Sequence, residues 1–541
     1  MPVVQNFIRN WRGSLWVMIF FGFVGASLLR KLFDPDVWFH MVVGREVIRQ
    51  MSIPPYEFYI LPRLGEPGEF HEWGFGVFYY LIEHYSGYVG MAIANSAIGC
   101  GILLCLYFSI HDKSKVELWP SLPAIALVLW VIEPRLNFRP ETLLYLLLAA
   151  EIFLLENYRV HKRIVWLIPL PFFTWLLNLG HPSAIFLIAV FGLYSLQAVF
   201  SSEERLKTGG ILGTVALAMA GASAINPYGL HQLLMPFYAL SNDQIADINE
   251  FLPVLQTEYA SRFIVMATIG AMAIFFAPER RLVDILLFLL FVILAFRYAR
   301  NIALLGIVAY IPTHRAITSL IAQIATTQTR IKIVASLCVF SGIAGVVAIA
   351  FNADWGVGIY EQNTPYKSAQ LLKQHDVQGN ILNFLHLGNY LAWELDRPVF
   401  VDGRNYNRNR AVELHNEIMM AVPGWEDIVH GFDIQAIVTP ATLDFSGEII
   451  PLVAVLENDP DWVLVGQEKS GLLFLRNPVQ NGIQVLPKNV IWHQAIEELN
   501  GTMALYPDSK ETYRSLATAY SHLGDVANQQ YFFRKFSSLS N

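Results

Sequence analysis

The stretch SLWVMIFFGFVGASLL, residues 14–29, is uncharged, and FDPDVWFHMVVGREVIRQ, residues 33–50, follows it closely. The first stretch has the composition of a membrane-anchoring helix and lacks the small-residue cleavage site of a secretory signal peptide. The second places Asp34 and Asp36 on either side of a proline, with aromatic residues directly after them. These acids either serve chemistry at the membrane boundary or cap a helix.

The composition indicates a polytopic membrane protein. Of the 541 residues, 54% are hydrophobic and 15% are charged, and the mean hydropathy is +0.42. About eleven segments have the length and low charge of spanning helices; they begin near residues 15, 90, 121, 142, 165, 183, 210, 263, 282, 302 and 333. The formal net charge of −7 gives no reason to expect nucleic-acid binding.

Basic residues predict the orientation. They cluster in alternate loops, for example Arg159 with Lys162 and Arg205 with Lys207, whereas the other loops are acidic or mixed. Because basic loops are poorly translocated, we expect a cytoplasmic N-terminus and an extracytoplasmic location for everything after about residue 352.

The chain divides into three predicted parts. Residues 1–351 form the transmembrane domain, with a first external loop at 32–72. Residues 352–485 alternate β-rich runs such as IQAIVT, WVLVG and LLFLRN with the helical stretch YKSAQLLKQ, which is typical of an α/β domain. Residues 486–541 have tetratricopeptide-like (TPR-like) spacing, too short for a solenoid, so we expect this tail to pack on its neighbour or bind a protein partner. A plain helical hairpin is the alternative.

Carboxylates recur on the predicted outer side. Asp34 and Asp36 precede WFHMVVGREVIRQ, which can form an amphipathic helix on the membrane surface. His71 and Glu72 stand just before the second apolar region, on the same predicted side. One acid is explained by helix capping, with Trp38 as a membrane anchor, but two acids are explained less well.

Arginines on the same side break the positive-inside pattern. Arg135 and Arg139 lie between the third and fourth spans, and Arg297 and Arg300 lie at the outer end of the ninth. A guanidinium donates two parallel hydrogen bonds to a phosphate, so these arginines are candidate ligands of an anionic substrate. Interfacial snorkelling or ion pairs with local acids explain any single one of them. His181, at an outer span end, is a further candidate.

The segment VFVDGRNYNRNR, residues 399–410, holds Asp402 and Arg404 in the predicted α/β domain. A strand that ends in a turn, with these two residues paired, accounts for it. An acceptor-binding role is the alternative.

The order of these motifs resembles the C-fold membrane glycosyltransferases, in particular their uncharacterised prokaryotic branch. The motifs are the DPD acids, HEW, RPE, N-x-G-H, NPYG, a late RN and an external C-terminal domain. Relatives include oligosaccharyltransferase catalytic subunits, protein O-mannosyltransferases and lipid A aminoarabinose transferases. The resemblance covers most of the chain, although the WWDYG motif of oligosaccharyltransferases is missing.

The resemblance implies a glycosyltransferase in the inner membrane of a prokaryote. A polyprenyl-phosphate sugar would be the donor, and the acceptor would be an extracytoplasmic protein, lipid or glycan, glycosylated with inversion. Asp36 would be the base, with Asp34 and Glu72 supporting it, and Arg139 or Arg300 would bind the donor phosphate, with Arg135, Arg297 and His181 as further candidates. His71, Asp402 and Arg404 would help to bind the acceptor. Asp34 and Asp36 would hold a divalent cation, Mg²⁺ or Mn²⁺, if one takes part.

Two other classes of function stay open. A non-catalytic assembly protein would use the membrane part to anchor a partner-binding module, and its acids and arginines would not converge. A transporter would place ionisable groups near the middle of its spans and would show inverted repeats. The sequence has no clear internal repeat, and its charges gather at the predicted boundary.

Overall fold

The computed structural model describes residues 17–109, 121–240, 249–277, 279–324, 336–337, 340, 343–347, 354–403, 410–443, 446–478 and 482–539. Contacts divide the chain into two compact units, which we name the helical unit (1–34 and 71–358) and the sheet unit (35–70 and 359–541). The last predicted span, from about residue 333, falls mostly outside the described residues.

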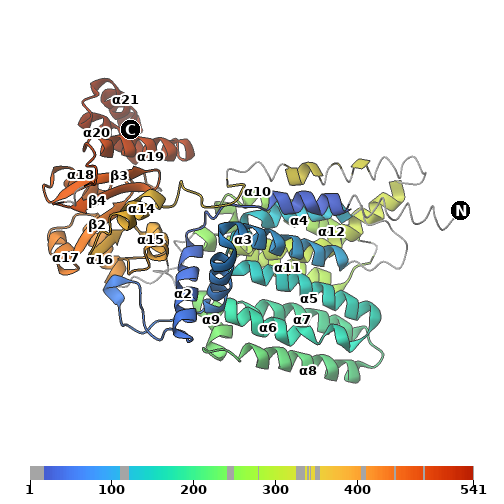
Figure 1. Ribbon diagram of the computed structural model, residues 1–541. Coiled ribbons are helices and arrows are strands. Elements are labelled where there is room, and N and C mark those ends of the chain that lie inside the picture. Colours follow the sequence, from blue (N-terminus) through green and yellow to red (C-terminus); the bar gives the residue numbers. More distant parts are fainter. Residues whose placement is uncertain are drawn as a thin grey trace. The chain divides into compact units, whose positions relative to one another are not determined.

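The helical unit is a bundle of helices (Figure 1), and its core consists of apolar side chains. After a first apolar helix, Val17–Ser27, its helices are α3 (Trp73–Phe108), α4 (Ser121–Ile132), α5 (Glu141–His161), α6 (Pro169–Gly180), α7 (Ala184–Phe200), α8 (Arg205–Ser223), α9 (Leu230–Leu240), α10 (Ala260–Phe276), α11 (Leu282–Arg297) and α12 (Ile302–Ile324). α3 is two helical stretches joined at Gly87, whose φ of +60° lies in the region that glycine adopts readily.

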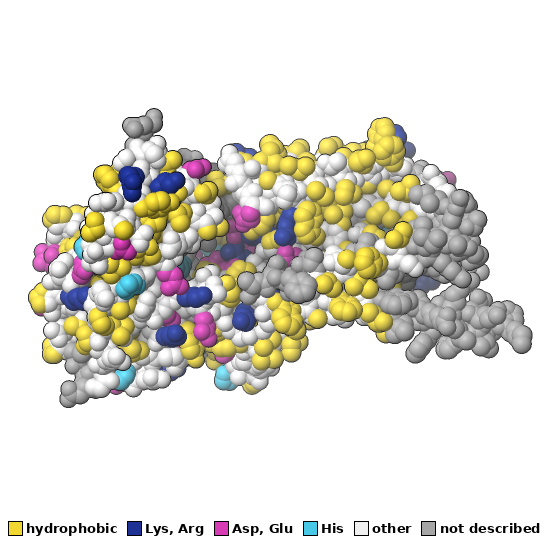
Figure 2. All heavy atoms as spheres, turned by 90° about the horizontal axis from the view of Figure 1, so that it is seen from above, with side chains coloured by type: hydrophobic (Ala, Val, Ile, Leu, Met, Phe, Trp, Pro, Cys, Tyr) yellow, Lys and Arg dark blue, Asp and Glu magenta, His cyan; other side chains and the backbone are white. Residues whose placement is uncertain are grey.

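The outside of this bundle is apolar as well. Large hydrophobic side chains such as Leu217, Phe275 and Ile293 are exposed, and Figure 2 shows few charged side chains over the described helices on that face. Among the helices that the structure describes, Trp73–Phe108 and Ala299–Ile321 are long and apolar enough to cross a membrane, and several others are apolar but shorter. The number of eleven spans therefore stays a prediction.

The sheet unit is built on a four-stranded sheet of order β1-β2-β4-β3. β1 (Asn380–Asn383) pairs in parallel with β2 (Ile434–Thr439), and β4 (Gly471–Arg476) is antiparallel to both β2 and β3 (Trp462–Glu468). The surrounding helices are α14 (Tyr366–Gln374), α15 (Gly388–Leu395), α16 (Arg410–Met419), α17 (Trp425–Gly431) and α18 (Pro451–Asn458). The predicted strands IQAIVT, WVLVG and LLFLRN and the predicted helix YKSAQLLKQ are thus present, with β-branched and aromatic residues in the strands. The strand predicted at the start of residues 399–410 is not formed within the described residues 399–403, and Val399 makes an isolated bridge instead.

The first external loop belongs to the sheet unit by its contacts. α2 (Asp36–Gln50) packs on α15, and Trp38 is buried with its ring 4.9 Å from that of Tyr390. Ile60 forms a parallel bridge with Val399. The predicted helix therefore exists. Trp38 is buried against protein, so the expectation that it anchors the helix in the membrane is wrong. The position of the helix on the membrane surface stays a prediction. The grouping of this loop also differs from the predicted transmembrane domain of 1–351.

The C-terminal tail is helical, as predicted. It consists of α19 (Val490–Leu505), α20 (Lys510–His522) and α21 (Val526–Ser538), and α20 and α21 pack on each other. The rings of Tyr520 and Phe532 stack across this hairpin at 5.4 Å. A hairpin with one preceding helix fits both the TPR-like and the plain-hairpin interpretation, so the TPR-like character stays a prediction.

Candidate active site

A chain of ion pairs joins three of the predicted arginines at one end of the helical unit. Arg139 contacts both Asp34 and Glu250. Arg135 lies 3.0 Å from Glu250 and 3.2 Å from Glu141, and Arg300 lies 2.6 Å from Glu141. We name these six residues the boundary network.

Short turns at the helix ends position this network. Arg135 ends the 3₁₀ turn Glu133–Arg135 after α4, and Glu141 is the first residue of α5. Glu250 lies in the turn Asn249–Phe251, and Arg300 lies in the turn Ala299–Asn301 between α11 and α12. Because helix ends gather at one face of a bundle, residues far apart in the sequence meet here.

The network is balanced in charge, with three arginines against three carboxylates. Burial of the Arg135 and Asp34 side chains, which are 4% and 3% exposed, is costly unless each charge has a partner. Arg139 and Arg300 are 22% and 26% exposed, so these two can reach an incoming anion more easily than Arg135 can. Arg300 also stacks over Phe251 at 4.8 Å, which fixes the plane of its guanidinium.

Glu72 and His181 form a second polar pair in the same unit. The imidazole Nε2 of His181 lies 3.5 Å from Glu72 Oε1, and its Nδ1 lies 2.7 Å from the Ser183 hydroxyl. Burial lowers the pKa of His181 to about 4, although nearby Glu141 opposes this change. His181 is therefore neutral near pH 7.

Asp34 and Asp36 fall on the two sides of the division between the units. Asp36 is the first residue of α2, and the N-cap is Pro35, so neither acid occupies the capping position that the structural alternative required. The Pro35 carbonyl accepts a hydrogen bond from the Asn389 side chain at 3.1 Å. Two residues of extended chain span at most about 7 Å, so the backbones of Asp34 and Asp36 stay close whatever the units do.

The remaining candidates have partners outside the boundary network. His71 Nδ1 is 3.1 Å from Gln232 Oε1, Arg297 is exposed and stacks on Tyr298, and Asp402 accepts a hydrogen bond from the Tyr59 hydroxyl at 2.8 Å in the sheet unit. Arg404, and with it the predicted pairing with Asp402, lies outside the described residues. The asparagine of NPYG caps its own turn, because Asn226 bonds to the backbone of Tyr228 and Gly229.

Glu141 and Glu250 were not predicted as site residues. Glu141 is one of the local acids near Arg135 and Arg139 in the sequence, and Glu250 belongs to a predicted outer loop that is acidic. The sequence does offer one indication of them. Several arginines lie on the predicted outer side, and each arginine that becomes buried needs a carboxylate partner from the same side.

The metal site predicted at Asp34 and Asp36 stays a prediction. No group of three or more histidine, cysteine, aspartate or glutamate side chains suited to a metal ion occurs among the described residues. The Asp34 carboxylate is paired with Arg139.

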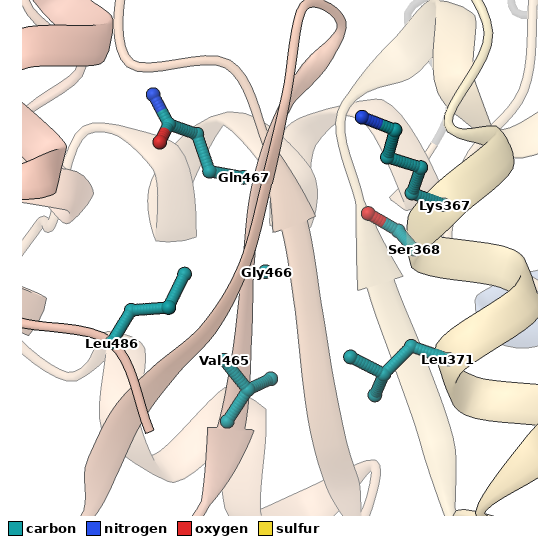
Figure 3. Close-up of a pocket in the computed structure, with 7 residues that line it drawn as sticks. All are labelled: Lys367, Ser368, Leu371, Val465, Gly466, Gln467 and Leu486. Atoms are coloured by element: carbon teal, nitrogen blue, oxygen red, sulfur yellow. The ribbon is translucent and has the colours of Figure 1, made fainter. Parts of the chain in front are cut away.

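A cavity of about 320 Å³ lies in the sheet unit between β3 and α14. Figure 3 shows Lys367, Ser368 and Leu371 on the helix side and Val465, Gly466 and Gln467 along the strand. This lining has one cation and no carboxylate, so the cavity lacks the acid that activation of a hydroxyl acceptor requires.

Two solved structures share the fold over most of the chain. The archaeal oligosaccharyltransferase AglB from Archaeoglobus fulgidus, in complex with an inhibitory peptide and a dolichol-phosphate, has a TM-score of 0.59 at 10% identity, covering 88% of this chain and 76% of that one. The A. fulgidus oligosaccharyltransferase in the apo form has a TM-score of 0.56, also at 10% identity, covering 91% and 78%. The fold is similar to that of AglB.

This similarity supports the predicted fold class, a helical membrane part with a C-terminal α/β domain. At 10% identity it concerns the fold alone. No protein-family model matches the chain, and no curated protein matches it.

Proposed function

We propose that this protein is a membrane glycosyltransferase that moves a sugar from a polyprenyl-phosphate donor to an extracytoplasmic acceptor, with inversion at the anomeric carbon. The boundary network carries the proposal, because it brings Asp34 together with Arg135, Arg139 and Arg300 at one end of an apolar bundle. The AglB-like fold and the dolichol-phosphate bound to that neighbour support a lipid-linked donor.

The arginines would act on the leaving group. When the bond between the anomeric carbon and the phosphate oxygen breaks, the phosphate gains one negative charge. Arg139 and Arg300, the more exposed arginines of the network, would donate hydrogen bonds to it, exchanging part of their contacts with Glu250 and Glu141. Donors aimed at developing charge stabilise a transition state more than the ground state.

Asp36 would be the base. It would take the proton of the acceptor hydroxyl as the oxygen attacks the anomeric carbon, and the phosphate would leave from the opposite face. Asp34 would hold Arg139 in place rather than accept the proton, since its carboxylate is already paired. The neutral His181 and Glu72 would position the sugar by hydrogen bonds.

The test is a transfer assay with the full chain in membranes. Radiolabelled polyprenyl-phosphate hexoses would be supplied one at a time, with extracytoplasmic extract as acceptor. We expect label transfer to fall at least about 100-fold in Asp36→Asn, the lower end for loss of a general base. The matched control is Asp427→Asn, an exposed aspartate on α17. Transfer that persists in Asp36→Asn would assign the base elsewhere, and no transfer from any donor by the native chain would count against the enzyme.

The assembly-protein alternative predicts scattered charges at the boundary. Three of the four predicted arginines instead share carboxylates with one another. A binding experiment separates the two functions. A short-chain polyprenyl phosphate should bind the native chain and bind Arg300→Gln at least about tenfold more weakly, since a charge-assisted hydrogen bond contributes about 1.5–3 kcal/mol.

A further inference from the structure

A second charged cluster lies at the opposite end of the helical unit. Glu156, near the end of α5, is 2.7 Å from Arg281, which is also 2.6 Å from Asp284 on α11. Arg315 of α12 lies 3.0 Å from Asp284, and Arg159 lies 2.8 Å from Glu156. Glu141, the first residue of α5, belongs to the boundary network, and the 21 residues of α5 span about 30 Å.

This cluster has more cations than anions. Arg159, Arg281 and Arg315 face two carboxylates, Glu156 and Asp284, and the ammonium of Lys162 lies just beyond them on the same helix end. Four cations against two anions leave a formal excess of +2. The charges of the boundary network balance, so the positive excess is a feature of this second cluster and not of the network at the other end of the bundle.

A cavity opens beside the excess charge. It has a volume of about 60 Å³, and Arg159, Lys162, Ser195 and Ser201 contribute polar groups to its lining, with Leu155 and Leu212 on its apolar side. A water-sized group needs about 10–15 Å³, so roughly four such groups fit, the number of oxygens in a phosphate. The hydroxyl of Ser195 is buried and has no hydrogen-bond partner among the described residues.

An unpartnered buried hydroxyl and surplus cations in one cavity indicate a missing acceptor. A buried hydroxyl without a partner costs about 1–3 kcal/mol, which a bound oxygen would recover. Two large apolar side chains are exposed nearby in the sequence: Phe200, the last residue of α7, is 59% exposed, and Leu206, in the first turn of α8, is 94% exposed. Leu206 lies between charged residues, Glu203 to Arg205 and Lys207, which are exposed too. Exposed apolar side chains flanked by charged ones suit the boundary between acyl chains and lipid headgroups.

We propose that this cavity, lined by Arg159, Lys162 and Ser195, binds the phosphate of an anionic membrane phospholipid. By the positive-inside pattern, the lipid belongs to the cytoplasmic leaflet. The site uses no residue of the boundary network, so it holds whether or not the chain transfers sugars.

The test measures lipid binding to the purified full chain in a neutral detergent. Short-chain phosphatidylglycerol, short-chain phosphatidylcholine and inorganic phosphate are titrated separately. We expect phosphatidylglycerol to bind at least about tenfold more tightly than the other two. We also expect Lys162→Gln with Ser195→Ala to lose about tenfold in that affinity or more, from a lost ionic contact and a lost hydrogen bond.

The control is Lys207→Gln, which removes an exposed lysine, paired with Glu204, at the start of α8. Its affinity should match that of the native chain. If the double variant does not fold, Ser195→Ala alone, which changes no charge, should still weaken binding severalfold. Equal binding of both lipids, equal binding of inorganic phosphate, or unchanged affinity in the variants would each overturn the proposal.

Discussion

At the residue scale, Arg139 forms ion pairs with both Asp34 and Glu250, and its loss would leave both acids without that partner. Removing one member of a buried pair costs about 3–5 kcal/mol, so Arg139→Gln should lower the thermal unfolding midpoint of the full chain in micelles clearly. Asp34→Asn combined with Arg139→Gln should recover part of the loss, because the buried carboxylate is then gone. Arg163→Gln, at an exposed position, is the control. A midpoint unchanged by Arg139→Gln would contradict this account of the network.

His415 makes the sheet unit sensitive to acid. Burial lowers the pKa of His415 to about 4, and its Nε2 has no hydrogen-bond partner among the described residues. Because the pKa is lower in the folded state than in the unfolded state, the contribution of neutral His415 is complete above about pH 6.5 and is lost as the pH falls towards 4.

The measurement is a urea titration of the full chain at pH 7 and pH 4.5, followed by hydrogen exchange in peptides of the sheet. We expect the midpoint for these peptides to fall with pH in the native chain and to fall less in His415→Gln. His493→Gln changes an exposed histidine and should keep the native pH dependence. Equal pH dependence in His415→Gln would rule out this histidine as the cause.

At the element scale, α2 is attached to α15 through Arg45. Its guanidinium donates to the carbonyls of Trp393 and Ala392, at 2.9 and 3.1 Å, and stacks over the Trp393 ring at 4.7 Å. These carbonyls belong to the last turn of α15, and the carbonyl groups of a last helical turn have no N–H partner within the helix. Arg45→Ala should therefore speed hydrogen exchange in residues 36–50 by at least about tenfold, as loss of charge-assisted bonds worth about 1.5–3 kcal/mol predicts.

Arg49→Ala is the matched control on the same helix. Its ion pair with Asp396 is about half exposed on both sides, and exposed pairs contribute about 0–1 kcal/mol. Exchange in residues 36–50 should change little. A larger effect from Arg49→Ala than from Arg45→Ala would show that the stacked contact is not what holds α2.

The local sequence pattern predicted the helices and strands better than it predicted which surfaces and residues they contact. YKSAQLLKQ forms α14 and IQAIVT forms β2, because short propensity signals suffice for such pieces. The helix that begins at Asp36 was predicted too, but its buried face was assigned to the membrane surface, since an apolar stripe looks the same against lipid and against protein. Arg135 and Arg300 were predicted as site residues because arginines are unusual on the outer side of a membrane. Glu250 could be assigned only from its contact with Arg135, which is far away in the sequence.

At the scale of the whole molecule, the predicted orientation can be tested by labelling. In a chain whose natural cysteines are replaced by serine, we expect Gln378→Cys to react with an impermeant maleimide in intact cells. Glu203→Cys, at the other predicted side, should react only after the membrane is permeabilised. Both positions are exposed, so accessibility within the protein does not limit the reaction. The reverse pattern would invert the orientation and place the boundary network in the cytoplasm.

The first external loop also bears on how such a protein can be divided. The chain passes from one unit to the other after Asp34, after Phe70 and after Gly358, rather than through a single linker. A C-terminal fragment that starts at Ile359 would lack α2 and the segment that pairs with Val399, and it would leave the Tyr390 ring without Trp38. The sheet unit is therefore not a detachable module. Any recombination that transplants it between relatives has to carry two separate pieces of sequence together.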